Sequence, residues 1–186
     1  MIPETERLIL RPFTVNDAAD AFEYLSRISI NCFMSMKINS MEEAVKEMEK
    51  RVKENDELYF AIELKETCKV IGEIFTHGET SNFDENRKDT YSPCWMLNDE
   101  YTGKGYAYEA AYALYDYLFN VLDARRIYAY TEDYNISSQK LCERLGMRKE
   151  GMFMEYVTFV SDEKGEPIYE NTMQWAILSK EWKEKH

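Results

Sequence analysis

One short segment, Asn98–Ala110, limits what this 186-residue chain can fold into. It reads NDEYTGKGYAYEA, so a lysine stands between two glycines directly before a stretch rich in alanine and tyrosine. The apolar run YSPCWML precedes it and apolar residues at helical spacing follow, which places the glycines between a predicted strand and a predicted helix. The segment therefore predicts either a phosphate-binding loop at a helix N-terminus or a plain capped turn.

Two familiar nucleotide-binding motifs do not fit this segment. A P-loop needs a glycine five residues before Gly103, where Asn98 stands, and it needs Ser or Thr after Lys104. The dinucleotide fingerprint would place glycine or alanine at Tyr108. Gly103 and Gly105 instead suit a loop whose backbone N–H groups point inward beside the positive end of a helix. Such a loop can hold the pyrophosphate of coenzyme A with few basic side chains.

The net charge of the chain argues against nucleic acid as a partner. The sequence has 23 Lys and Arg against 35 Asp and Glu, which gives a formal net charge of −12. Nucleic-acid binding depends on cations that neutralise phosphates, so an acidic chain is poorly suited to it. The same charge favours solubility and attracts cationic partners such as amines or basic peptides.

The composition predicts one globular domain over residues 1–186. Hydrophobic residues make up 45% and charged residues 31%, and a chain of this length fits a single core. The four cysteines show no C-x-x-C spacing and there are two histidines, so no metal site is expected. The N-terminus lacks a basic segment before an apolar one, and no run reaches about 18 apolar residues. We expect no signal peptide, no membrane span and a cytoplasmic protein with reduced thiols.

Hydrophobic periodicity predicts a mixed α+β sheet. Thr14 and Ser40 are suitable helix N-caps with an acid three residues later, and Asn135 can cap a short helix that ends near Gly146. Pro93 indicates an edge or a bulge within its strand. The predicted strands cover 7–13, 58–64, 69–75, 91–97, 125–131, 151–160 and 168–178, with a polar loop at 78–90 and helices that begin near residues 14, 40, 105 and 135.

Three segments occur together in the order found in a known enzyme superfamily. They read TERLILRPFTVNDA, YTGKGYAYEA and NISSQKLCERLGMRKEGMF. The chain resembles the GNAT superfamily of acyl-CoA N-acyltransferases from Thr5 to about Leu178, and within it the Rim-type branch that acetylates protein N-termini. The resemblance implies a central mixed, mostly antiparallel sheet of about seven strands flanked by about four helices. It also implies a V-shaped splay between the fourth and fifth strands.

The resemblance further implies acetyl-CoA as co-substrate, no metal, and a set of cofactor-binding residues. The family motif is Arg/Gln-x-x-Gly-x-Gly/Ala, and Glu100 stands here at its first position. The backbone of this loop would hold the pyrophosphate, and the strand before it would pair with the pantetheine arm like an added strand. An Asn-x-x-Ser segment would contact the thioester end. By position these residues are Met96, Leu97, Thr102, Gly103, Lys104, Gly105, Tyr106, Ala107, Asn135 and Ser138.

The family reaction is direct attack of an amine on an acetyl thioester, which needs a base for the amine and benefits from a proton for the departing sulfur. Many members have a tyrosine four residues before the Gly of LG, where this chain has Cys142. Ser138, one turn earlier, is our first choice to interact with the sulfur. Glu73 and Glu155 are the candidate bases, and the alternative for each is a solvated strand residue. His77 is a further candidate base, with simple exposure as its alternative.

Three functions stay open on sequence grounds. The first is acetylation of a primary amine at a protein or peptide N-terminus, which the Rim-type resemblance implies. The second is acetylation of a small amine (a polyamine, an amino sugar or an antibiotic), which the acidic composition and the 78–90 loop favour. The third is a coenzyme A-binding regulatory module without catalysis, which the departures at Glu100 and Cys142 favour. The sequence does not distinguish a monomer from a homodimer.

Overall fold

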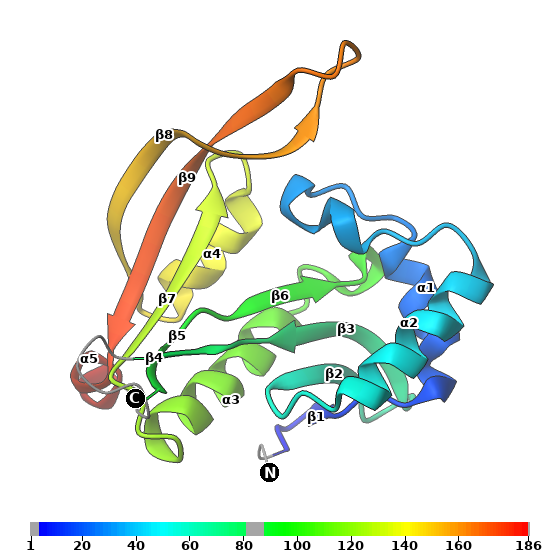
Figure 1. Cartoon of the computed structure of the whole chain (residues 1–186). Helices are drawn as coiled ribbons and strands as arrows, with labels where there is room; N and C mark the ends of the chain where they lie inside the picture. Colours follow the sequence, from blue (N-terminus) through cyan, green and yellow to red (C-terminus); the bar gives the residue numbers. More distant parts are fainter. Residues whose placement is uncertain (1–3, 81–87, 186) are drawn as a thin grey trace.

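The computed structural model describes residues 4–80 and 88–185 as a mixed set of strands and helices (Figure 1). In the first range the elements are β1 (Leu8–Arg11), η1 (Val15–Asp17), α1 (Ala18–Leu25), η2 (Asn31–Met36), α2 (Met41–Glu54), β2 (Tyr59–Leu64), β3 (Lys69–Phe75) and β4 (Gly78–Thr80). In the second they are β5 (Lys88–Tyr91), β6 (Cys94–Leu97), η3 (Asp99–Tyr101), α3 (Tyr106–Asn120), β7 (Arg126–Glu132), α4 (Ile136–Arg144), β8 (Arg148–Ser161), β9 (Pro167–Leu178) and α5 (Ser179–Lys185). The predicted α+β class is confirmed, with more strands and helices than the sequence indicated.

The strands form two sheets that meet near Tyr91. One sheet has the order β1-β2-β3-β6 and is antiparallel throughout. The other has the order β4-β5-β7-β9-β8, in which β5 and β7 are the parallel pair. The predicted hairpin of β2 and β3 and the predicted C-terminal hairpin of β8 and β9 are both present.

The splay between the two sheets begins at Pro93. The sequence predicted one strand over 91–97, but the structure divides this segment into β5 and β6, which belong to different sheets. β5 pairs with β7 at Thr90–Arg126 and Tyr91–Ile127, and β6 pairs with β3 instead. A proline has no N–H to give to a ladder, which suits the point where a strand changes neighbours. β6 and β7 therefore diverge, as Figure 1 shows.

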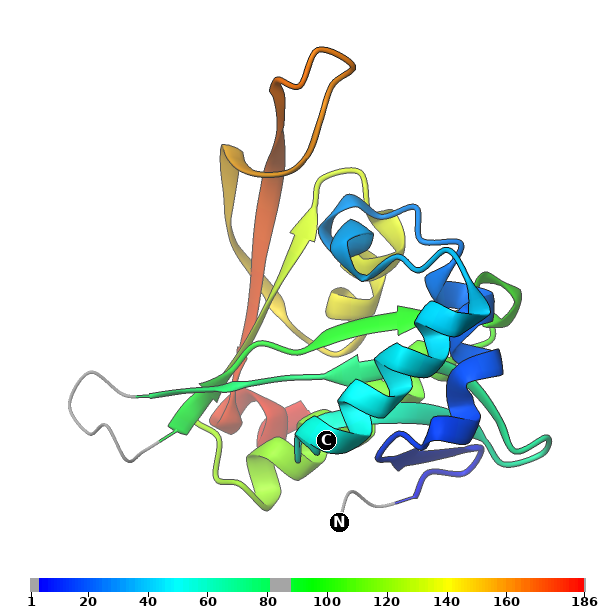
Figure 2. The same cartoon turned by 45° about the vertical axis from the view of Figure 1, so that its right-hand side comes forward.

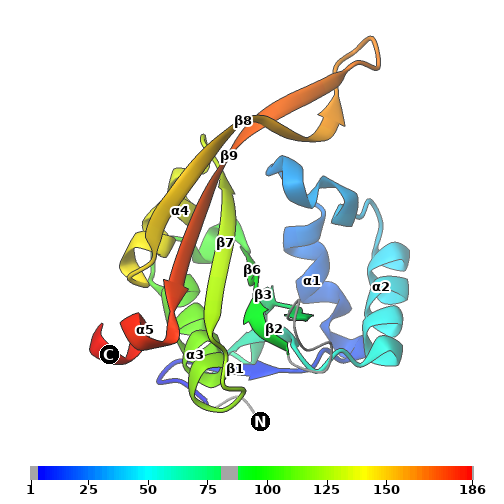
Figure 3. The same ribbon diagram turned by 60° about the vertical axis from the view of Figure 1, so that its left-hand side comes forward.

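Helices cover both faces of the four-stranded sheet (Figure 3). α3 lies on one face and, with α4 and α5, closes a core that includes Leu114, Leu118 and Trp182. α1 and α2 lie on the other face over a second core that includes Leu25 and Met48. The sheet is the middle of three layers, and burial of both its faces holds β3 and β6 in fixed positions.

The N-cap residues predicted at Ser40 and Thr14 are present, but one expected capping hydrogen bond has a different donor. Oγ of Ser40 accepts the N–H of Glu43 at 3.2 Å, so α2 begins where the sequence indicated. The Glu43 carboxylate accepts from the backbone N–H of Asn39 rather than from that of Ser40. At the start of η1, the N–H of Thr14 donates to the Asp17 carboxylate at 2.7 Å.

The C-terminal hairpin forms an arm that extends beyond the rest of the molecule (Figure 2). Both of its strands are longer than the sequence predicted, and register shifts interrupt their pairing. η2, which the sequence did not predict, contacts β8 beside the splay. β4 and β5 take up part of the predicted 78–90 loop, and the rest of that loop lies outside the described residues. Within the described ranges, no helix is long and apolar enough to cross a membrane.

Candidate active site

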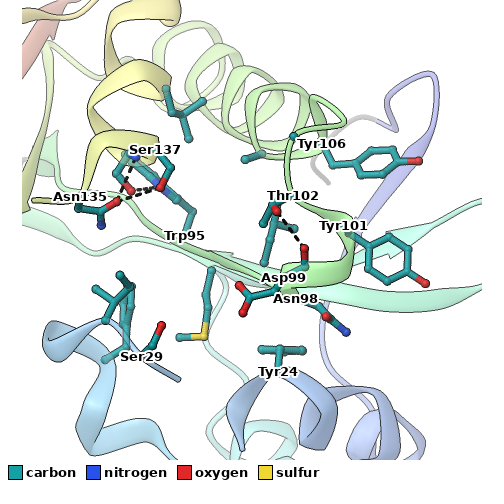
Figure 4. A pocket seen from close by; sticks show the side chains of 18 of the residues that line it. Tyr24, Ser29, Trp95, Asn98, Asp99, Tyr101, Thr102, Tyr106, Asn135 and Ser137 are labelled. Atoms are coloured by element: carbon teal, nitrogen blue, oxygen red, sulfur yellow. Dashed lines mark hydrogen bonds between the residues drawn. The ribbon is translucent and has the colours of Figure 1, made fainter. Parts of the chain in front are cut away.

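A cavity of about 370 Å³ lies between β6 and α4, on the side where the two sheets separate. β6, the loop after it and the first turn of α3 line one side, and the end of α1 with the segment leading into η2 lines another. Figure 4 shows Thr102 and Tyr106 toward one end and Asn135 and Ser137 toward the other. The cavity thus connects the two segments that the sequence singled out, the glycine loop and the Asn-x-x-Ser segment.

The glycine loop has the backbone that a phosphate cradle requires. Gly103 and Gly105 have φ of 74° and 86°, the left-handed region that favours glycine. A Cβ placed on Gly103 would meet no atom within 4 Å, so open space adjoins the loop there. Gly105 is the N-cap of α3, whose free N–H groups and positive dipole end face the same loop. Backbone and space together fit a pyrophosphate group.

Nearly all the predicted cofactor-binding residues line this cavity. The exception is Lys104, whose Nζ donates to the backbone carbonyl of Glu100 at 2.9 Å. The residues that line it are Met96, Leu97, Thr102, Gly103, Gly105, Tyr106, Ala107, Asn135 and Ser138.

Arg7 and Glu109 hold the glycine loop in place. Glu109, in the first turn of α3, accepts hydrogen bonds from Thr5 Oγ1 at 2.6 Å, from the Arg7 N–H at 2.8 Å and from Arg7 Nε at 2.6 Å. Arg7 Nη1 also donates to the carbonyl of Lys104 at 3.0 Å. Burial would raise the pKa of Glu109, but the bonds from Thr5 and Arg7 lower it below its ordinary value. The N-terminal segment therefore fixes the middle residue of the loop.

β6 offers a free backbone edge to the cavity. Its other edge pairs with β3 at Gly72–Leu97 and Glu73–Met96. Among the strands that the structure describes, none pairs with the second edge, and both Met96 and Leu97 line the cavity. An extended chain with amide groups, such as a pantetheine arm, can hydrogen-bond to such an edge as an added strand.

Asn135 and Ser138 order the opposite end of the cavity. Asn135 Oδ1 accepts the N–H of Ser138 at 3.2 Å and the hydroxyl of Ser137 at 3.0 Å, so Asn135 is the N-cap of α4, as predicted. Ser138 Oγ accepts a hydrogen bond of 3.1 Å from Trp95 Nε1. Trp95 belongs to β6, so this bond crosses from one wall of the cavity to the other.

Three cations at the cavity were missed by sequence reasoning. Arg27 follows α1, and Lys140 and Arg144 belong to α4. Arg144 lies 4.5 Å from the centre of the Tyr108 ring, and Arg27 pairs with the exposed Glu100 at 3.3 Å. No motif marks these residues, because the fold alone brings them together. These cations line the cavity together with the acids Glu23 and Asp99.

Glu73 occupies a place that argues against its role as the base. Its side chain is 0% exposed, and it does not line the cavity. Its two oxygens accept hydrogen bonds from Tyr24 at 2.9 Å, Tyr59 at 2.8 Å and the buried Arg51 at 2.6 Å. A carboxylate that pairs with a buried guanidinium and accepts two tyrosine hydroxyls serves to hold together the elements that carry these groups. The structure thus places Glu73 as the counter-ion that joins β3 to α1 and α2.

Glu155 and His77 also lie away from the cavity. Glu155 is exposed at a register shift of β8, with φ of 48°, and its N–H donates to Asn171 Oδ1 at 2.9 Å. This position agrees with the alternative given for Glu155 in the sequence analysis, a solvated strand residue. His77 is exposed near Asp56, with 3.6 Å between Nδ1 and Oδ2.

Cys142, which stands where many relatives have tyrosine, faces the core rather than the cavity. It is buried, and burial raises the pKa of its thiol to about 12. Its neighbour Leu141 lines the cavity, but Cys142 does not. Of the two residues considered for the departing sulfur, the structure brings Ser138 to the cavity. Within residues 4–80 and 88–185, no three His, Cys, Asp or Glu side chains are grouped to hold a metal ion.

A splayed mixed sheet with a glycine loop at a helix N-terminus fits the class of acyl-CoA-dependent transferases. Residues 7–148 match the family described as acetyltransferase (GNAT) domain. The chain belongs to this family and is an N-acetyltransferase.

Relatives of this chain cover almost its whole length. It is 32% identical over 178 residues to the uncharacterized N-acetyltransferase YnaD of Bacillus subtilis, a match that covers 96% of this chain and 97% of YnaD. Its fold is similar to a crystal structure of a GNAT-family acetyltransferase from Bacillus anthracis, with a TM-score of 0.81, 27% identity and coverage of 97% and 99%. A putative ribosomal-protein-serine acetyltransferase from Vibrio cholerae has a TM-score of 0.70 at 21% identity, with coverage of 94% and 95%. At that identity the likeness shows the fold alone.

Proposed function

We propose that this N-acetyltransferase moves the acetyl group of acetyl-CoA to a primary amine by direct attack on the thioester, with a peptide N-terminus as the acceptor. One observation carries the cofactor assignment. The cavity has a phosphate cradle at Gly103–Gly105, a free strand edge at Met96–Leu97 and an ordered hydroxyl at Ser138, in the order of the parts of acetyl-CoA. When bound, acetyl-CoA supplies the activated acetyl group.

Ser138 has the geometry to serve the departing sulfur. An indole N–H can only donate, so Ser138 Oγ is the acceptor in its bond with Trp95. The hydroxyl hydrogen of Ser138 donates to no group among the described residues, so it is available to a group in the cavity. A hydrogen bond to the sulfur stabilises negative charge as the C–S bond breaks.

The peptide acceptor rests on the Rim-type resemblance and on the acidic charge of the chain, which attracts an ammonium group. The test is thiol release from acetyl-CoA with peptides that begin with Ser or Ala, followed by mass spectrometry to locate the acetyl group. Peptides with a blocked N-terminus are the matched control. Acetylation of the free N-terminus supports the proposal, and acetylation of lysine side chains alone contradicts it.

A small amine is the second candidate acceptor, and the net charge of −12 favours it equally. A panel of polyamines, amino sugars and aminoglycosides in the same assay separates the two. A kcat/KM for any of these that exceeds the best peptide value by tenfold or more would replace the peptide as the proposed acceptor.

A further inference from the structure

Two buried carboxylates beside the cavity have no cationic partner in the part of the chain that the structure describes. Among described residues, the buried acids are Asp17, Glu73, Asp89, Glu132 and Glu170. The first three pair with arginines, in the pairs Asp17–Arg11, Glu73–Arg51 and Asp89–Arg125. Neither Glu132 nor Glu170 forms an ion pair within residues 4–80 and 88–185. An unpaired carboxylate in a buried position is costly when it is ionised, so a cation supplied by a ligand would stabilise it there.

The two carboxylates lie on one face of the C-terminal sheet. Glu132 at the end of β7 stands opposite Thr172 of β9, and Glu170 lies two residues further along β9 on the same face. η2 lies over them: Asn31 Nδ2 donates to one oxygen of Glu170, and the hydroxyl of Tyr134 donates to the other at 3.1 Å. Glu170 is thus oriented from two sides.

Glu132 has a weaker set of neighbours. Cys32 on η2 lies near it, and burial, followed by the influence of Glu132, raises the pKa of that thiol. Asn135 Nδ2 donates to Glu132 over a long 3.4 Å. Burial, followed by the charge of Glu132, raises the pKa of Cys94 on β6 to about 11, so both nearby thiols are neutral at pH 7. A neutral thiol is a poor hydrogen-bond donor, so a charged donor would bind the Glu132 carboxylate more strongly.

Thr172 supplies an independent sign of a missing ligand. Its side chain is buried, with 4% of its surface exposed, and its Oγ1 has no hydrogen-bond partner among the described residues. By register it lies between Glu132 and Glu170. A buried hydroxyl without a partner is costly, and here it stands between two acceptor groups.

Glu132, Thr172 and Glu170 do not themselves line the cavity, but residues bonded to them or next to their partners do. Asn135 lines the cavity, and while its Oδ1 accepts from Ser138, its Nδ2 donates to Glu132. Ile30 and Phe33, on either side of Asn31 and Cys32, also line the cavity. One amide side chain therefore separates Glu132 from the residue assigned to the departing sulfur.

We propose, on the basis of the amine acetyltransferase function above, that the acceptor's ammonium group binds between Glu132, Thr172 and Glu170, and that Glu132 takes its proton. An ammonium group has three N–H donors, which two carboxylates and a hydroxyl oxygen complement. Proton transfer leaves a neutral amine and a protonated Glu132. The nitrogen then bonds to the acetyl carbon as the C–S bond breaks. Of the two protons that the nitrogen loses overall, one ends on the thiol and one leaves to solvent.

The kinetic test compares Glu132→Gln and Glu170→Gln in the full chain, with a peptide bearing a free N-terminal serine and with spermidine as probes. Glu132→Gln should lower kcat/KM for the better probe by about 100-fold or more, mainly through kcat. Glu170→Gln should raise the probe KM about tenfold with a smaller effect on kcat. Cys32, Cys94 and Tyr134 are the other titratable groups near Glu132 and stay unchanged in both variants. The exposed Glu163→Gln is the matched control and should behave like wild type.

A purely structural role predicts different results, because Glu170 also attaches η2 to the sheet through Asn31. Loss of that attachment would lower the melting temperature and weaken acetyl-CoA binding. Thr172→Val separates the two roles, since it removes an unpaired hydroxyl without changing the shape of the side chain. The proposal predicts an equal or higher melting temperature together with a higher probe KM. An unchanged probe KM in Thr172→Val, or unchanged kcat/KM in Glu132→Gln, would overturn it.

Calorimetry of each probe with the coenzyme A-saturated protein tests the site without turnover. Binding by wild type that weakens at least tenfold in Glu132→Gln/Glu170→Gln supports the site. Equal affinity in both proteins, or no binding of either probe by wild type, overturns it. If the wild type binds a probe, the double variant binds it at least tenfold more weakly, and the wild type still releases no thiol, the ammonium site stands. The proposed acetyl transfer is then contradicted.

Discussion

The indole Nε1–H of Trp95 donates a hydrogen bond of 3.1 Å to Oγ of Ser138. Trp95 belongs to β6 and Ser138 to α4, so this bond joins two walls of the cavity at the end opposite the glycine loop. The hydroxyl proposed to serve the departing sulfur is thus oriented by a residue that no motif marks.

Ser138→Ala should lower kcat by about 100-fold, at the low end of the range for proton-donating groups, with a smaller change in acetyl-CoA affinity. The reason is that the hydroxyl acts on the sulfur as the bond breaks and contributes little to binding before that. Steady-state thiol release and calorimetry give the two quantities. Equal losses of kcat and of acetyl-CoA affinity would instead show that Ser138 is a binding residue.

Trp95→Phe is the companion to that experiment, because it keeps the hydroxyl but removes the donor that orients it. It should lower kcat less than Ser138→Ala does. The double variant should be no slower than Ser138→Ala alone, because both changes act on one hydrogen bond. Additive losses would show that Trp95 contributes independently of Ser138.

Glu73→Gln should destabilise the fold by about 3–5 kcal/mol, because it leaves the buried Arg51 without its counter-ion. Urea unfolding measures this change. Glu47→Gln is a matched control, since Glu47 pairs with the same arginine from a partly exposed position and should cost less than about 1 kcal/mol. A stable Glu73→Gln protein with no activity would restore Glu73 as a candidate base.

Glu150 should make stability fall at acid pH. Hydrogen bonds from Arg126, partly opposed by burial and supported by Arg148, lower the pKa of Glu150 from 4.5 to about 2. Because the folded pKa is depressed, the stabilisation is complete above pH 4.5 and is lost as the pH falls toward 2. Glu150→Gln should cost about 1 kcal/mol at pH 7, since water screens this partly exposed pair, and less at pH 3. A cost that is the same at both pH values in urea unfolding would refute this role.

Local features could be predicted from the sequence, because neighbouring residues determine them. The glycines of the loop, the Ser40 cap and the Asn135 cap each depend on a few adjacent residues, and all are present where expected. Pro93 indicated an interruption of its strand. Which sheet each half would join depends on pairing with β7, more than 30 residues away, and no local pattern contains that information.

The candidate bases could not be chosen from the sequence, because strand alternation does not say what covers a face. Glu73 and Glu132 both lie on strands, and their surroundings come from distant helical segments. Arg51 of α2 compensates Glu73, whereas η2 brings a thiol to Glu132. Arg27 and Arg144 likewise come to line the same cavity only when the chain folds.

The most direct test of the cofactor cavity is the affinity for acetyl-CoA of Gly103→Ala, measured by isothermal titration calorimetry beside Gly165→Ala. Both glycines have positive φ (74° and 85°) and open space at the Cβ position, so each substitution should cost a similar 1–2 kcal/mol of stability, as an order of magnitude. Gly103 lines the cavity, whereas Gly165 lies in the turn of the β8–β9 arm. We predict affinity at least tenfold weaker, about 1.4 kcal/mol, for Gly103→Ala and wild-type affinity for Gly165→Ala. Equal affinity in the two variants, or no binding of acetyl-CoA by the wild type, would contradict the assignment.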